Sequence, residues 1–248
     1  YNQETIVNFA KVFTGWSYCN QTCGNSQPGI VNFRDPMIVT PANHDFSTKT
    51  LLNYPGSTPV IPAGLDPADD LDAALDNIFY HPNTAPFISK SLIQQMVTSN
   101  PTPAYVGRVS AVFRDNGLGV RGDLKAVVRA ILLDPEARGN VKTDPNYGHL
   151  REPVLYLTSV LRPFNPTANN NITVPASCNG LSDGAINTLT QPLDQDVWNP
   201  PTVFNYYPMD YIIPNTPLAG PEFQIFSTGT ALKRPNAIGQ FAPSNSAA

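Results

Sequence analysis

Proline limits how this chain can fold more than any other residue does. The sequence has 26 prolines in 248 residues, about twice the usual share. Proline lacks a backbone N–H donor and has a fixed φ, so it suits the first turn of a helix and suits turns, but it breaks a helix interior. The prolines therefore have two uses here. At helix boundaries they delimit short helices, and across 17–65 and 163–217 they stiffen long loops.

Helical periodicity is clear wherever the apolar pattern is regular. Apolar residues spaced i, i+3, i+4 predict a first helix over roughly 3–14. Segment 66–134 predicts four helices with short Pro-punctuated turns, starting at Asp66-Pro67, Thr84, Pro103 and Asp123. Further helices are expected over about 151–161 and 220–233. The predicted fold is all-α: a single helical domain over 1–248, a compact bundle with long Pro/Asn-rich loops and room for a short β-hairpin within 17–65.

Low charge narrows the class of protein. Charged residues are 14 % of the chain, where a soluble domain carries about 25 %, and the net charge is −4. This composition argues against a nucleic-acid or anionic-membrane partner. No apolar run approaches the ~18–20 residues that span a bilayer. We therefore expect an extracytoplasmic protein, whether periplasmic, on the cell surface or secreted, and the start at Tyr1 suggests the C-terminal part of a longer chain.

Three cysteines leave two interpretations open. Cys19 and Cys23 lie in a turn-like segment and Cys178 is distant. They predict a disulfide, either within 19–23 or from one of these residues to Cys178, as is typical of extracytoplasmic proteins. The alternative is metal ligation, but a CxxxC with one distant Cys and no nearby His is a poor zinc site. We predict no metal and no cofactor.

Several sequence blocks carry a family resemblance and keep their order along nearly the whole chain. They are FTGW at 13–16, HD at 44–45 with KTLL at 49–52, HPNTA at 81–85 before FISKSL at 87–92, GDLKAVV at 122–128 with DPE at 134–136, PPTVFNYY at 200–207 and AGPEFQ at 219–224. With these blocks the chain resembles the C-terminal half of the bacterial family DUF1800. The resemblance implies an exported protein and assigns no activity.

The histidines are the candidates for catalysis. His44 beside Asp45, with Lys49 nearby, could act as acid and base or bind a metal, and His81 could meet His44 in space. The alternative is a loop clasp in which Asp45 accepts backbone N–H groups and Lys49 pairs with a carboxylate. His81 also fits a helix C-terminus, and His149 fits the start of a helix.

Acidic and aromatic residues form the second group of candidates. Asp66, Asp69, Asp70 and Asp72 lack the glycine and terminal glutamate of a calcium loop, so helix capping explains them better. Glu222 and Asp210 could act as paired carboxylates if they lay ~5–10 Å apart. The candidate binding residues are aromatic, and they could equally fill a core: Trp198, Tyr206, Tyr207 and Tyr211.

Three functions remain open at this stage. The sequence has no GxSxG, Walker, GxGxxG or HExxH motif. We therefore expect first an exported structural or scaffold subunit that binds a protein partner or a surface polymer. The second expectation is a hydrolase that acts on a polysaccharide or another polymer through His44, Asp45 and His81. The third is a carbohydrate-binding module that uses the aromatic residues of 198–211, which requires exposed, coplanar rings.

Overall fold

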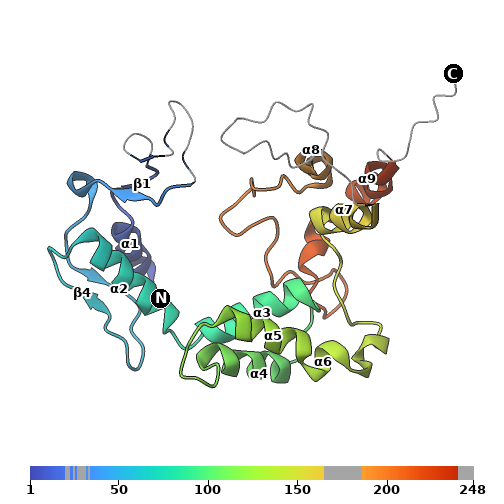
Figure 1. Cartoon of the computed structure of the whole chain (residues 1–248), viewed down its shortest axis with the longest axis horizontal. Helices are drawn as coiled ribbons and strands as arrows, with labels where there is room; N and C mark the ends of the chain where they lie inside the picture. The colour runs from blue at the N-terminus through green and yellow to red at the C-terminus, as the bar shows by residue number, and fades with distance from the viewer. Residues whose placement is uncertain (20–22, 25, 27–31, 33, 165–185, 240–248) are drawn as a thin grey trace. The chain divides into compact units, whose positions relative to one another are not determined.

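Short helices dominate the chain, and they fall into two compact units (Figure 1). The computed structural model describes residues 1–19, 23–24, 26, 32, 34–164 and 186–239. Residues Tyr1–Phe87 form the first unit and Ile88–Ala248 the second. The predicted all-α class with a short hairpin is confirmed. Each unit has a hydrophobic cluster of its own. That residues 1–248 form a single domain stays a prediction.

The first unit consists of two helices and two small antiparallel sheets. In β1–β2, Trp16 pairs with Val39, and in β3–β4, Lys49 pairs with Ile61. The predicted 3–14 helix ends slightly earlier than expected. The elements are α1 (Gln3–Val12), β1 (Trp16–Ser17), β2 (Ile38–Val39), η1 (Pro41–Asn43), β3 (Lys49–Thr50), β4 (Val60–Ile61) and α2 (Pro67–Phe79).

Helix α2 and the β3–β4 hairpin close the core of this unit. Asp66 caps α2 by accepting the Ala68 N–H at 2.9 Å, and Pro67 occupies the first helical position, as the sequence predicts. The buried cluster consists of Val12 of α1, Ile61 of β4, Ala74 of α2 and Leu51, which directly follows β3. The loop 17–65 is therefore held in part by its own short strands.

The second unit begins with consecutive helices at the predicted caps and prolines. They are α3 (Thr84–Met96), which the unit boundary crosses, α4 (Pro103–Arg114), α5 (Leu124–Leu133) and α6 (Pro135–Arg138). Thr102 and Asp123 accept N–H groups of the helices they precede, and α4 packs on α5, where the Tyr105 hydroxyl donates to the Ile131 carbonyl at 2.7 Å. The bundle expected over 66–134 is thus divided, because α2 packs on α1 in the first unit.

In the rest of the second unit, α7 packs against α8 and α9 (Figure 1), and the short helix η2 packs on α6. The buried residues Leu157, Leu193 and Ala237 form its core. The elements are η2 (Asn140–Thr143), α7 (Pro153–Leu161), η3 (Arg162–Phe164), α8 (Ile186–Thr190), η5 (Gln191–Leu193), η6 (Pro221–Ile225) and α9 (Thr228–Gly239). The single helix expected over 220–233 is wrong. Two helices form there, because the Ser227 hydroxyl accepts the Thr230 N–H and starts α9 afresh.

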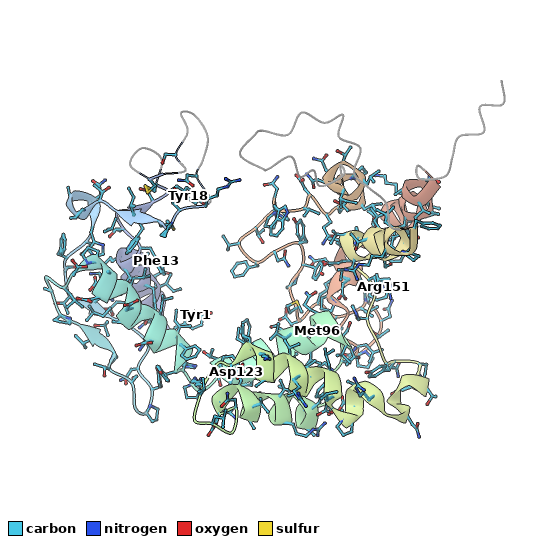
Figure 2. All side chains as sticks on the ribbon, in the orientation of Figure 1. Tyr1, Phe13, Tyr18, Met96, Asp123 and Arg151 are labelled. Carbon is cyan, nitrogen blue, oxygen red and sulfur yellow. A yellow bond between two sulfur atoms is a disulfide. The ribbon has the colours of Figure 1, made fainter. Side chains whose placement is uncertain are left out.

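A disulfide joins Cys19 to Cys23, next to the labelled Tyr18 in Figure 2. The Cα atoms are 5.9 Å apart, within the usual range for a disulfide. This pairing is one of the three that the sequence left open, and Cys178 lies outside the described residues. Each helix in the described ranges is too short or too polar to span a bilayer.

Candidate functional site

His44, the first catalytic candidate, lies directly after η1 and is held in place by both ring nitrogens. Nδ1 lies 2.8 Å from the Thr14 carbonyl oxygen and Nε2 lies 3.1 Å from Asp70 Oδ2. The backbone of Gly15 lies close to the Thr40 carbonyl oxygen and to the His44 backbone nitrogen, where a side chain would not fit. Its φ is +80°, and a Cβ there would lie 2.8 Å from the Thr40 carbonyl oxygen. Both ring nitrogens thus have an oxygen partner within the protein.

Asp70 and Lys49 complete this buried cluster. Lys49 Nζ lies 2.5 Å from Asp70 Oδ2 and also donates to the Asp45 and Ser47 carbonyls. The side chains of His44, Lys49 and Asp70 are each 1 % exposed or less. No substrate can reach side chains this deeply buried, so the cluster joins the 44–49 loop to α2. The Asp70 carboxylate thus binds His44 and Lys49 and does not cap the helix. Lys49 pairs with a carboxylate, as expected for the loop-clasp alternative.

Asp45 and His81 have local structural contacts. Asp45 Oδ1 accepts the Ser47 N–H at 2.8 Å, and hydrogen bonds from Ser47 hold the pKa of Asp45 below its usual value. His81 follows the end of α2, where its ring contacts Tyr54 edge-on at 4.9 Å. Since both ring nitrogens of His44 are occupied by other partners, the structure does not pair His44 with His81.

Trp198, the first aromatic candidate, is 95 % exposed in the second unit. Its φ is +69°, a left-handed conformation that is uncommon for a bulky side chain. The backbone on both sides is fixed by hydrogen bonds to Asp196: the Tyr206 hydroxyl donates to its carbonyl oxygen, and Asn199 donates to its carbonyl and carboxylate oxygens at 2.9 Å each. The chain therefore holds an exposed indole in a strained, hydrogen-bonded turn.

A second turn presents two more apolar side chains. Val203 is 94 % and Phe204 79 % exposed. The Phe204 N–H donates to the Thr202 hydroxyl at 3.1 Å, and the Asn205 N–H donates to the Thr202 carbonyl oxygen at 3.1 Å. We call residues 196–207 the aromatic loop. Val203 and Phe204 are not among the binding residues predicted from the sequence, although the absence of any charged residue over 197–207 could have indicated them.

A groove of about 430 Å³ lies between the aromatic loop and the start of α7. Trp198 and Tyr206 line it together with Glu152 and Gln195. Gln195 is fixed on both sides: it donates to Glu152 Oε2 at 2.7 Å and accepts the Val154 N–H at 2.7 Å. Two of the polar side chains that line this groove, Glu152 and Gln195, thus already have hydrogen-bond partners.

The other two aromatic candidates differ in accessibility. Tyr207 is 2 % exposed and its hydroxyl donates to Glu152 Oε2 at 2.6 Å, so its ring belongs to the core. Tyr211 is half-buried, with its N–H bonded to the Pro208 carbonyl and its carbonyl oxygen to the Gly220 N–H. Of the four rings named by the sequence analysis, the structure brings Trp198 and Tyr206 together on one surface.

His149 and Glu222 meet in the second unit, although 73 residues separate them in the chain. His149 Nδ1 lies 3.4 Å from Glu222 Oε1. His149 is therefore not a helix N-terminal residue, since α7 begins at Pro153 with Glu152 as its cap. Asp210 is exposed. In the described part of the chain, no three His, Cys, Asp or Glu side chains are arranged to hold a metal ion.

Comparison with known families agrees with the sequence blocks. The model of the family described as protein of unknown function DUF1800 matches residues 1–226. The chain belongs to this family. Comparisons with curated proteins and with solved structures find no match.

Proposed function

We propose that this DUF1800 protein is an exported subunit that binds a protein partner through the aromatic loop. The observation that carries the proposal is Trp198, which is 95 % exposed in a left-handed backbone conformation. Such a conformation costs about 1–3 kcal/mol and persists where the surrounding structure enforces it, often at binding sites. Because the Trp198 side chain is 95 % exposed, it buries too little apolar surface in the free protein to offset this cost.

The energetics of recognition favour these side chains. Trp198, Val203 and Phe204 together expose a large apolar surface on a loop that is already ordered by hydrogen bonds. A pre-ordered loop loses little conformational entropy on binding, which raises affinity. Buried aromatic anchors of this kind typically contribute at least about 2 kcal/mol each to a protein interface.

The composition of the aromatic loop indicates the chemical class of its partner. Residues 197–207 carry no charge, and the neighbouring Asp194 and Asp210 are exposed. An uncharged aromatic centre with a polar edge is typical of protein interfaces. We therefore expect a protein with an apolar pocket edged by Lys or Arg. A polysaccharide is the weaker candidate, since Val203 offers no ring for stacking and Tyr207 is buried.

Export is the second part of the proposal. A Cys19–Cys23 disulfide persists in oxidising compartments and is rare in the cytosol. The low content of charged residues is consistent with this location. We propose a periplasmic, cell-surface or secreted protein.

The test compares wild type with W198A/F204A and with L118A, a matched control. Leu118 is 85 % exposed in the same unit but lies outside the aromatic loop. Each purified protein is used to capture partners from extracytoplasmic extract of the source organism. The protein captured by wild type and L118A is then purified, and its Kd for all three is measured by calorimetry.

We expect a stoichiometric complex whose Kd rises at least about 30-fold in W198A/F204A and stays unchanged in L118A. An equal Kd for all three proteins would refute the aromatic loop as the binding surface. Binding of a purified polysaccharide, lost in W198A/F204A, with no protein complex formed would instead support the carbohydrate-binding alternative.

A further inference from the structure

A groove of about 400 Å³ lies in the first unit, along one face of α2. Helix α2 and its C-cap contribute Ala73, Asp76, Asn77 and Tyr80, whose spacing of i, i+3, i+4 and i+7 puts them on one side of the helix. The rest of the lining comes from residues 54–65, which include the loop between β3 and β4. We call this depression the α2 groove. It is separate from the aromatic loop, because all its lining residues belong to the first unit.

The loop that lines the α2 groove is fixed to α2 by hydrogen bonds. The Asn77 side chain accepts the Leu52 N–H at 3.1 Å and donates to the Leu52 carbonyl oxygen at 2.9 Å. The Tyr54 hydroxyl donates to the Asn77 carbonyl oxygen at 2.8 Å, and the Ser57 N–H donates to the Tyr54 carbonyl oxygen at 2.9 Å, which closes a turn. A ligand therefore meets a lining that is already ordered, so little conformational entropy is lost on binding.

The polar side chains of the lining favour a ligand that donates hydrogen bonds. A hydroxyl group has one proton, and those of Tyr54 and Ser57 are donated to the Asn77 and Tyr54 carbonyl oxygens, each at 2.8 Å. Any further hydrogen bond to these two hydroxyl oxygens has to be donated by the ligand. Asp76 is exposed, and an exposed aspartate is negatively charged near neutral pH, where it only accepts hydrogen bonds.

The charge of the first unit favours a cation. Residues Tyr1–Phe87 contain eight acidic and three basic side chains, a net charge of −5, whereas the whole chain carries −4. Helix α2 contains four aspartates and no Lys or Arg. Among the described residues, Asp76 is the one charged side chain of the lining, and no Lys, Arg or His forms an ion pair with it. The electrostatic potential of this unit therefore attracts positively charged ligands.

Two tyrosine rings and several apolar side chains complete the lining. Tyr80 is 58 % exposed and follows Asp76 by four residues, so their Cβ atoms lie about 5–6 Å apart on the helix surface. The Tyr54 ring is held beside the same helix end by its hydroxyl. The faces of such rings attract ammonium groups. The apolar part of the lining suits a hydrocarbon stem, and it includes Val60, Pro62 and Leu65.

The geometry points to a binding site for a primary alkylammonium group in the α2 groove. The three N–H donors of the ammonium group suit the Asp76 carboxylate and the hydroxyl oxygens of Tyr54 and Ser57, which a quaternary ammonium cannot reach with a proton. The tyrosine rings add a cation–π attraction, and the stem lies on the apolar side chains. Two sources carry this group, namely a lysine side chain of a polypeptide and a free diamine. The volume of about 400 Å³ accommodates either one.

The test is a titration of the isotope-labelled full chain, followed by amide NMR. The probes are Nα-acetyl-lysine methylamide, which represents a lysine side chain, and cadaverine, a free diamine. The control ligand is the Nε-acetylated form of the first probe, which keeps the stem and loses the charge. With each probe at up to about 10 mM, we expect saturable shifts in the amides of 54–65 and 73–80, with a Kd near about 1 mM. The acetylated control should give none.

Matched variants locate the site on the helix. D76N and D72N each remove one acidic charge from α2, but Asp72 is exposed and does not line the groove. We expect the Kd to rise by about 3–30-fold in D76N and in Y80A, and to stay within about 2-fold of wild type in D72N. Because both altered side chains are exposed, the amide spectrum outside the groove should remain that of the folded wild-type chain.

The relative affinities of the two probes assign the source. Tighter binding of the lysine derivative would support a polypeptide ligand, and tighter binding of cadaverine would support a free amine. Equal rises of Kd in D76N and D72N would overturn the site, since the general acidity of the unit would then explain the binding. The absence of saturable shifts in wild type, or equal binding of the acetylated control, would overturn it as well.

Discussion

The buried cluster of His44, Lys49 and Asp70 predicts a large and specific loss of stability in D70A. The substitution removes the carboxylate and leaves Lys49 Nζ and His44 Nε2 without their buried acceptor. The matched control is D72A, because Asp72 is exposed on the same helix.

The magnitude follows from the two hydrogen bonds to Asp70 Oδ2, at 2.5 and 3.1 Å. Hydrogen bonds to charged groups contribute about 1.5–3 kcal/mol each, which gives about 3–6 kcal/mol. Breaking a buried ion pair by removing one partner costs about 3–5 kcal/mol. We therefore expect D70A to lose about 4 kcal/mol, a large part of the 5–15 kcal/mol typical of a folded domain. D72A should stay within about 0.5 kcal/mol of wild type.

The assay is urea unfolding followed by tryptophan fluorescence. The chain has two tryptophans, so a W198F background leaves Trp16 as the reporter of the first unit. With an m value near 2 kcal/mol/M, the midpoint in D70A should fall by about 2 M. Coincidence of the Trp16 and circular dichroism transitions tests the predicted single domain.

An equal midpoint for D70A and D72A would refute the reasoning that the cluster stabilises the unit. The double variant K49M/D70L provides a second check. Replacing a buried pair by apolar side chains of similar size is often neutral, so the part of the loss that comes from Lys49 should be recovered, while the part that comes from His44 remains. A double variant as unstable as D70A would show that the charges themselves are not the cause.

Three smaller effects follow from single contacts. G15A should destabilise the first unit by about 1–3 kcal/mol, since Gly15 has φ +80° and its Cβ would contact Thr40; thermal unfolding measures this. The hydrogen bond from Arg108 holds the pKa of Asp134 below its usual value. The contribution of this carboxylate to the free energy of unfolding should therefore be complete above about pH 4 and should fall as the pH drops through the lowered pKa. In D134N, acid unfolding curves should show a shallower loss. Y207F should cost about 2 kcal/mol in urea unfolding, because the buried hydroxyl of Tyr207 donates to a carboxylate.

The sequence predicts local structure well in this protein because local chemistry decides it. Asp66-Pro67 and Asp123 start helices where expected, since a side-chain oxygen at the cap satisfies a free N–H within three residues. The prediction of a single helix over 220–233 was wrong, because η6 and α9 form there. There Ser227 restarts the helix through a hydrogen bond that the apolar pattern does not reveal.

Tertiary structure alone decided which candidates are accessible. His44 meets Asp70 across 26 residues and is sealed, whereas His149 meets Glu222 across 73 residues beside an open groove. Sequence spacing has no information on such long-range pairs, because burial and side-chain partners depend on how the elements pack. Trp198 and Tyr207 make the same point, since one ring is exposed and the other is in the core.

By itself, the sequence determined that the chain forms short helices delimited by proline, with long loops between them. It also indicated the DUF1800 family. The restriction of proline is local, fixed by its own ring and its missing N–H, and so it can be read without a structure. The tertiary structure decided that the chain divides into two units, that the side chain of His44 is buried, and that grooves lie beside Trp198 and beside His149. These outcomes depend on contacts between residues far apart in the chain.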